Sequence, residues 1–172
     1  YAISNEWKDA PFKSAFVEFL SSWNILRQKV DSTSVLFAVG EIVKVEAMHK
    51  ATDMYGPLPY LKFGLTNPVP YDSQQAIYES FFKELDHAID ILVKFDQANP
   101  SSKALVKFDL IFNSNIPNWI RFANSLKLRL AMRISAVYED AQKIAEAAVA
   151  HPYGVIESND HNPTMQSNSN LS

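Results

Sequence analysis

The chain of 172 residues contains no cysteine. This absence excludes disulfide bonds, thiolate-bound metals and cysteine nucleophiles, but it leaves the cellular compartment open, because a secreted protein can also lack cysteine. Glycine is scarce as well, with only four residues. None of them forms a phosphate-cradling loop or the Gly-x-Ser-x-Gly turn of a serine hydrolase. Nucleophilic catalysis therefore has no support in the sequence.

The chain also lacks a strong charge and a long apolar run. Its net charge is −3, and no basic run alternates with aromatic residues, so nothing indicates a nucleic-acid partner. No apolar run is long enough to cross a bilayer. The first residue is Tyr1 rather than Met. We therefore expect a processed or trimmed chain whose targeting or lipid-anchoring signal lies upstream.

The hydrophobic pattern that is present predicts an all-α fold, since 47% of the residues are hydrophobic and they recur at helical spacing. Helices are predicted over residues 12–30, 34–55, 73–95, 117–135 and 139–150. The second is apolar almost all round and should be the most buried. We expect one helical domain over residues 1–157. The Asn- and Ser-rich residues 158–172 should form a polar tail that is disordered or truncated.

The predicted helix over residues 117–135 has apolar side chains on two sides. Trp119, Leu126 and Leu130 share one broad arc, whereas Leu128 and Met132 lie roughly opposite, where a surface helix is normally polar. A helix that is packed on two sides indicates stacked layers of helices.

Two cations, Lys127 and Arg133, fall inside this apolar arc. Buried cations need carboxylate partners, and Glu46 lies beside the apolar arc of the helix over residues 34–55. We therefore predict a structural ion pair between Glu46 and either Arg133 or Lys127.

Glu46 and His49 form one Glu-x-x-His pair, and Glu84 and His87 form another. Two such pairs, with two further glutamates, can hold a di-metal centre in a four-helix bundle. However, Glu84 and His87 lie on the polar face of their helix. Turning them inward would expose large apolar residues such as Leu85, at roughly 1.5–3 kcal/mol each. We therefore favour the ion pair and expect no metal or cofactor, while a di-metal enzyme stays an alternative.

A long proline-rich segment over residues 56–72 separates two predicted helices, and long loops are often functional. Tyr60, Phe63 and Tyr71 lie in this loop, and exposed aromatic rings can stack on the apolar faces of sugars. The alternative is that these rings pin the loop to the helices, because aromatic side chains usually bury area.

Several motifs, in the same order and at the same spacing, resemble the SusD/RagB group of Bacteroidetes surface lipoproteins. They are Ala51-Thr-Asp-Met-Tyr-Gly-Pro-Leu-Pro-Tyr60, Val69-Pro-Tyr-Asp-Ser-Gln-Gln-Ala-Ile-Tyr78, Glu84-Leu-Asp-His-Ala-Ile-Asp-Ile-Leu92 and Gly154-Val-Ile-Glu-Ser-Asn159. The helix with the pattern Trp-x-x-Phe-Ala-Asn-Ser-Leu-x-x-Arg-Leu-Ala-x-Arg is similar to the most recognisable stretch of that family. The resemblance covers about residues 41–162.

The resemblance implies an all-α fold of tetratricopeptide-like stacked helix pairs, here a partial SusD-like α-α superhelix. It also implies a lipid-anchored protein at the outer-membrane surface that binds glycans or other nutrients and works with a SusC-like TonB-dependent transporter. Such proteins are not enzymes and use no cofactor. The chain is much shorter than family members and lacks the lipidated cysteine. Within it, we expect Tyr60, Phe63 and Tyr71 to contact the ligand.

Two other functions stay open at this point. One is a helical scaffold that binds proteins and has no small-molecule ligand. The other is the di-metal helical-bundle enzyme; a glycosidase is disfavoured, because its two carboxylates cannot be picked out from the sequence.

Overall fold

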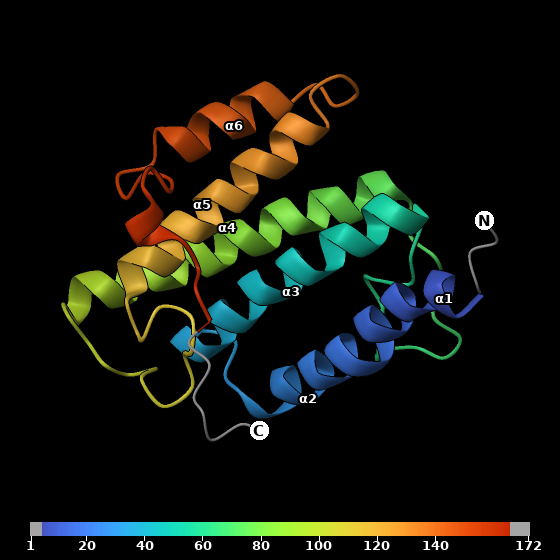
Figure 1. Ribbon diagram of the computed structural model, residues 1–172, viewed down its shortest axis with the longest axis horizontal. Coiled ribbons are helices and arrows are strands. Elements are labelled where there is room, and N and C mark those ends of the chain that lie inside the picture. Colours follow the sequence, from blue (N-terminus) through green and yellow to red (C-terminus); the bar gives the residue numbers. More distant parts are fainter. Residues whose placement is uncertain (1–4, 166–172) are drawn as a thin grey trace. The chain divides into compact units, whose positions relative to one another are not determined.

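The computed structural model describes residues 5–165, and its regular elements are helices, as the sequence predicts (Figure 1). Within this range no strand is formed; Leu58 and Asp72 make an isolated antiparallel bridge. The helices are α1 (Asn5–Lys13), the π-helical segment η1 (Ser14–Leu20), α2 (Ser21–Lys29), α3 (Val35–Tyr55), α4 (Gln74–Ala98), α5 (Ile116–Arg133), α6 (Ala141–Val149) and the 3-10 turn η2 (Asn159–His161). The all-α prediction is confirmed.

The predicted bounds of α3 to α6 agree closely with the structure, but the first predicted helix differs. It begins at Asn5 rather than near residue 12, and Pro11 lies inside it rather than before it. Proline lacks an N–H donor and disturbs the regular bonding of a helix. The π-helical segment η1 follows directly; such wide turns are rare and occur mostly within longer α-helices.

The chain divides into two compact units, Tyr1–Ala88 and Ile89–Ser172, and α4 begins in the first and ends in the second. The single domain predicted over residues 1–157 stays a prediction. Of the predicted polar tail, residues 158–165 are described and include η2, whereas residues 166–172 lie outside the described range. No helix of the described chain is both long and apolar enough to span a membrane.

In the first unit, the segment from α1 to α2 runs antiparallel to α3, and α3 runs antiparallel to the start of α4 (Figure 1). Helix α3 begins at Ser34, whose hydroxyl accepts a hydrogen bond from the Phe37 N–H and so caps the helix. Ile42, Val45 and Met48 are fully buried along α3. This is the extensive burial that the all-round apolar pattern of the helix predicts.

In the second unit, α5 and α6 form an antiparallel pair (Figure 1). Trp119, Leu126 and Leu130 are buried on α5, as the apolar arc predicts. Leu128 is half-buried and Met132 is 61% exposed, so burial on two sides does not extend to the end of the helix.

The loop between α4 and α5 is organised around one buried carboxylate. Asp109 accepts hydrogen bonds from the backbone N–H groups of Ile111, Phe112 and Ser114 and from the indole N–H of Trp119, over 2.8–2.9 Å. These four donors satisfy a charge that would be costly to bury alone. The start of α5 is thereby fixed to the loop before it.

Candidate ligand-binding site under the loop of residues 56–73

The proline-rich segment forms an ordered loop that is tied to itself and to α3. Leu58 and Asp72 exchange two backbone hydrogen bonds, of 3.2 and 2.8 Å. The Asp72 carboxylate also accepts bonds from the backbone N–H groups of Tyr60 and Leu61, at 3.0 and 2.7 Å. At the end of α3, the Thr52 hydroxyl donates to the carbonyl oxygen of the residue that begins the loop, at 2.7 Å.

A cavity of about 210 Å³ lies under this loop within the first unit. Its walls come from α2, α3, α4 and the loop, and they include Trp23, Arg27, Lys44, Tyr60, Phe63 and Glu84. Pockets for drug-sized ligands typically measure about 300–1,000 Å³. The cavity therefore has room for one small group rather than for an extended ligand.

A buried ion pair occupies one wall of the cavity. Lys44 Nζ lies 2.8 Å from Glu84 Oε1, and these side chains are only 9% and 16% exposed. The Tyr60 hydroxyl donates to Glu84 Oε2 at 2.6 Å, and the Ser80 hydroxyl donates to Oε1 at 3.0 Å. Both carboxylate oxygens are therefore hydrogen-bonded, which compensates the cost of burying the charge.

Lys44 also contacts two aromatic rings of the cavity. Its Nζ lies 4.6 Å from the centroid of the Trp23 ring and 5.2 Å from that of Tyr60, within the range of cation–π attraction. Burial, together with the adjacent Glu84 carboxylate, raises the pKa of Tyr60 well above its ordinary value. The Tyr60 hydroxyl therefore keeps its proton and acts as a donor.

A second carboxylate lies beside this pair but does not line the cavity. Glu41 Oε2 is 2.7 Å from Nδ1 of His87. Burial raises the pKa of Glu41, while the hydrogen bond to His87 and the charge of Lys44 act in the opposite direction.

Arg27 also lines the cavity and holds the loop in place. Its Nε donates to Asn24 Oδ1 at 2.9 Å, and a terminal nitrogen donates to the carbonyl oxygen of Phe63 at 3.0 Å. Gly64 has φ +69°, and a Cβ atom there would lie 2.6 Å from Asn24 Oδ1. The loop therefore closes directly onto α2.

The structure brings together two of the three predicted ligand contacts. Tyr60 is 6% exposed and lines the cavity. Phe63 is half-buried, lines the same cavity and packs against the Phe16 ring, with centroids 6.0 Å apart. Tyr71 is 66% exposed and does not line it. Tyr60 and Phe63 thus also pack the loop against the helices, and the contact of the three aromatic residues with a ligand stays a prediction.

The sequence did not indicate most of the other cavity residues, and it singled out Glu84 only as a possible metal ligand. Trp23 and Arg27 lie four positions apart on one helix face, a spacing that could have paired them. Lys44 gave no comparable signal, because nothing in the sequence distinguishes it from the other charged residues of its helix.

The residues of the predicted structural ion pair lie in different environments. Glu46 binds Lys50 of its own helix at 2.8 Å. Lys127 is half-buried, whereas Arg133 is exposed, so the expectation that Arg133 is embedded in an apolar face is wrong. Arg133 is the last residue of α5. At this position a cation can reach solvent and interacts favourably with the helix dipole. The pairing of Glu46 with either cation stays a prediction.

The sequence placed the second Glu-x-x-His pair on a polar face of α4 that points away from the core. In the structure this face instead contacts α3. Glu84 binds Lys44 and His87 binds Glu41, so this polar face of α4 packs on polar residues of α3. The helical pattern cannot show that a neighbouring helix supplies matching charges. Across residues 5–165, no group of three or more His, Cys, Asp or Glu side chains lies close enough to hold a metal ion.

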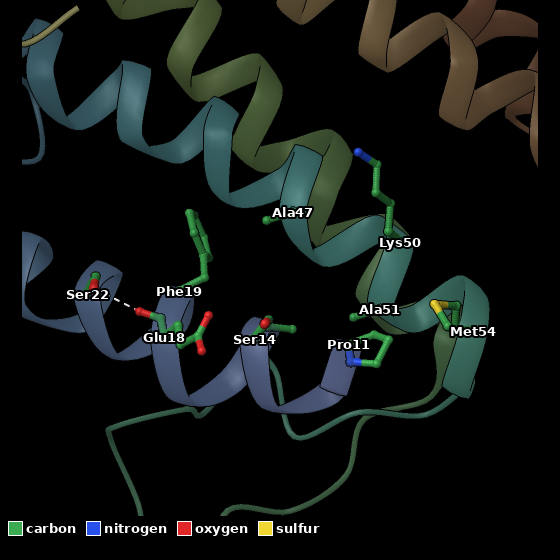
Figure 2. A pocket seen from close by; sticks show the side chains of 10 residues that line it. Pro11, Ser14, Glu18, Phe19, Ser22, Ala47, Lys50, Ala51 and Met54 are labelled. Carbon is green, nitrogen blue, oxygen red and sulfur yellow. Dashed lines mark hydrogen bonds between the residues drawn. The ribbon is translucent and has the colours of Figure 1, made fainter. Parts of the chain in front are cut away.

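A larger and more open groove of about 540 Å³ lies between η1 and α3 (Figure 2). Alanines of both walls make it wide, and Phe19 reaches from η1 toward α3. Glu18 and Lys50 line it, and the Glu18 carbonyl oxygen accepts a bond from the Ser22 hydroxyl. None of the predicted ligand contacts lines this groove, so the loop-covered cavity is the stronger candidate site.

Comparison with solved structures places this fold among known proteins. A chitin-binding SusD homolog from Flavobacterium johnsoniae is 34% identical, with a TM-score of 0.91 over 97% of this chain and 35% of its own. A SusD homolog from Bacteroides vulgatus is 33% identical, with a TM-score of 0.85 over 98% of this chain and 35% of its own. A SusD-like protein from Bacteroides thetaiotaomicron is 29% identical, with a TM-score of 0.86 over 95% of this chain and 34% of its own.

The chain therefore spans about a third of the length of these relatives, and it shares their tetratricopeptide-like helical fold. No curated protein matches it. The family model described as Susd and RagB outer membrane lipoprotein matches residues 1–172. The chain belongs to this SusD-like family.

Proposed function

We propose that this protein binds glycan nutrients at the cell surface and passes them to a SusC-like TonB-dependent transporter of the outer membrane. A lipid anchor outside this chain would hold it at the membrane. The observation that carries the proposal is membership of the SusD-like lipoprotein family. The chitin-binding relative from Flavobacterium johnsoniae supports a saccharide ligand. The mechanism is capture and release without bond cleavage.

The loop of residues 56–73 is the proposed contact region in this chain. Tyr71 offers an exposed ring on which the apolar face of a sugar can stack. Phe63 stands at the edge of the cavity, half-buried, and Tyr60 contributes from inside it. In this proposal Tyr71 and Phe63 touch the sugar ring, while Tyr60 also positions the loop through Glu84.

The test is saccharide binding by the full-length protein and its variants, measured by affinity electrophoresis and isothermal titration calorimetry. Chitin oligosaccharides are the first probe, within a wider panel. Stacking on an aromatic ring contributes about 0.5–1.5 kcal/mol, so Tyr71→Ala should weaken binding by roughly two- to tenfold. Phe108→Ala is the matched control, because Phe108 is also an exposed aromatic, at 69%, on a different loop. If Tyr71→Ala and the unmodified protein bind the saccharide with equal affinity, Tyr71 does not contact it and the site lies elsewhere.

A helical scaffold that binds a protein partner is the second candidate function. One observation favours it: Val106, Phe108 and Leu110 are exposed on the loop between α4 and α5. Exposed apolar groups of this kind are common at protein interfaces. This function predicts no binding to any member of the saccharide panel.

A further inference from the structure

We propose that the cavity under the loop of residues 56–73 recognises an anionic group on the ligand, either the carboxylate of a uronic acid or a sulfate ester. This inference rests on the proposed function, because it assumes that the ligand is a glycan. It specifies which class of sugar the site selects.

The charges in the cavity wall do not balance. Arg27, Lys44 and Glu84 are its charged lining residues. Lys44 and Glu84 neutralise each other at 2.8 Å. Among the described residues, Arg27 donates to neutral acceptors only, namely an amide oxygen and a backbone carbonyl oxygen. The lining therefore carries one positive charge that no carboxylate of the cavity compensates.

The hydrogen-bond donors of the cavity also favour an anion. A guanidinium group has five N–H donors in a rigid plane, and two of those of Arg27 are used by Asn24 and Phe63. The remaining donors can bind two oxygens of one carboxylate or sulfate, a geometry in which arginine is stronger than lysine. Because Arg27 is already held by these two bonds, little side-chain entropy is lost when an anion binds.

The cavity is, in addition, poorly suited to a neutral sugar ring. Lys44 Nζ already lies over the rings of Trp23 and Tyr60, and the Tyr60 hydroxyl is committed to Glu84. Phe37 packs against Trp23, with ring centroids 5.0 Å apart. With a volume of about 210 Å³, the cavity holds a single group recognised by charge and hydrogen bonds rather than by stacking.

The Glu41 carboxylate does not line the cavity, and its Oε2 is engaged by Nδ1 of His87 at 2.7 Å. It therefore does not offset the positive charge of Arg27 in the lining. A charge-assisted hydrogen bond in a half-buried site is also stronger than the same bond at the surface.

The experiment is calorimetric titration of the full-length protein with three probes: a trigalacturonate, a sulfated chondroitin disaccharide and the neutral chitotriose. We expect an acidic probe to bind at least about tenfold more tightly than the neutral one, and the difference between the two acidic probes identifies the group. Arg27→Gln should remove this preference. Lys29→Gln, an exposed lysine on the same helix, is the matched control for the lost charge and should keep it.

The outcomes separate the inference from the function on which it rests. If chitotriose binds as tightly as the acidic probes, or if Arg27→Gln keeps the preference, the inference is overturned while glycan binding stands. If no saccharide binds, both are overturned. Thermal unfolding of Arg27→Gln identifies a variant that has simply lost its fold, and Arg27→Lys then serves in its place, with partial retention of the preference expected.

Discussion

At the scale of single residues, the Lys44–Glu84 pair is the most informative contact in the first unit. A charge buried without its partner is costly, even where the intact pair adds little stability. Glu84 already satisfies both oxygens through Lys44, Tyr60 and Ser80. The cluster therefore fixes the mutual position of α3, α4 and the loop.

Removal of the Lys44 side chain should leave Glu84 without its ion-pair partner and destabilise the first unit. We expect Lys44→Ala to lower the free energy of unfolding by about 3 kcal/mol, near the lower end for a broken buried pair because Glu84 is 16% exposed. Lys50→Ala is the control, since Lys50 is 64% exposed and its pair with Glu46 is worth less than about 1 kcal/mol. Urea denaturation measures the free energy of unfolding of both variants. Equal decreases for Lys44→Ala and Lys50→Ala would show that Lys44 is not effectively buried.

At the scale of elements, the loop of residues 56–73 depends on its close approach to α2. Gly64 and Gly56 both have positive φ, at +69° and +73°, so a side chain at either position is strained. They differ in their surroundings. A Cβ atom at Gly64 would collide with Asn24, which holds Arg27, whereas a Cβ atom at Gly56 would meet no atom within 4 Å.

The two glycines therefore resist substitution for different reasons. Gly64→Ala should cost about 1–2 kcal/mol from its positive φ, and more because the loop or Asn24 must also move. Gly56 has φ +73° and ψ −124°, a region nearly restricted to glycine, so Gly56→Ala is destabilising through backbone strain alone. Urea denaturation in an Asn24→Ala background separates the two causes: the cost of Gly64→Ala should fall there, whereas the cost of Gly56→Ala should not change. An unchanged cost of Gly64→Ala would show that the loop is not seated on α2 as described.

The same elements show which features of the fold and the site can be predicted from the sequence. The bounds of α3 and α5 follow from periodicity and capping, because these signals are local. The helical turns before residue 12 and the π-helical segment after Pro11 were not predicted, since proline is far more common in the first turn of a helix than inside it. In the site, Tyr60 and Phe63 were predicted from a long aromatic loop. Arg27 and Lys44 were not, because only tertiary packing brings α2 and α3 under that loop.

The exposure of Arg133 has a similar cause. A helical wheel places this residue in the apolar arc, but it does not show that the helix ends there. The burial of a helix end depends on the elements packed around it, and the sequence of the helix alone does not predict which elements these are.

At the scale of the whole molecule, the chain covers about a third of its relatives' length, and the candidate cavity lies entirely within the unit Tyr1–Ala88. The site therefore does not depend on how the two units are arranged. Its loop joins a tetratricopeptide-like helix pair, and long loops on a rigid helical scaffold commonly carry binding residues.

The central claim, that this loop contacts the glycan, is tested most directly by hydrogen–deuterium exchange of the full-length protein with and without its saccharide. Amide exchange slows where a ligand stabilises a segment against opening. We predict slower exchange in peptides covering residues 60–72 and unchanged exchange in the exposed loop of residues 103–111. Protection confined to other parts of the protein at saturating saccharide, with residues 60–72 unchanged, would contradict the account.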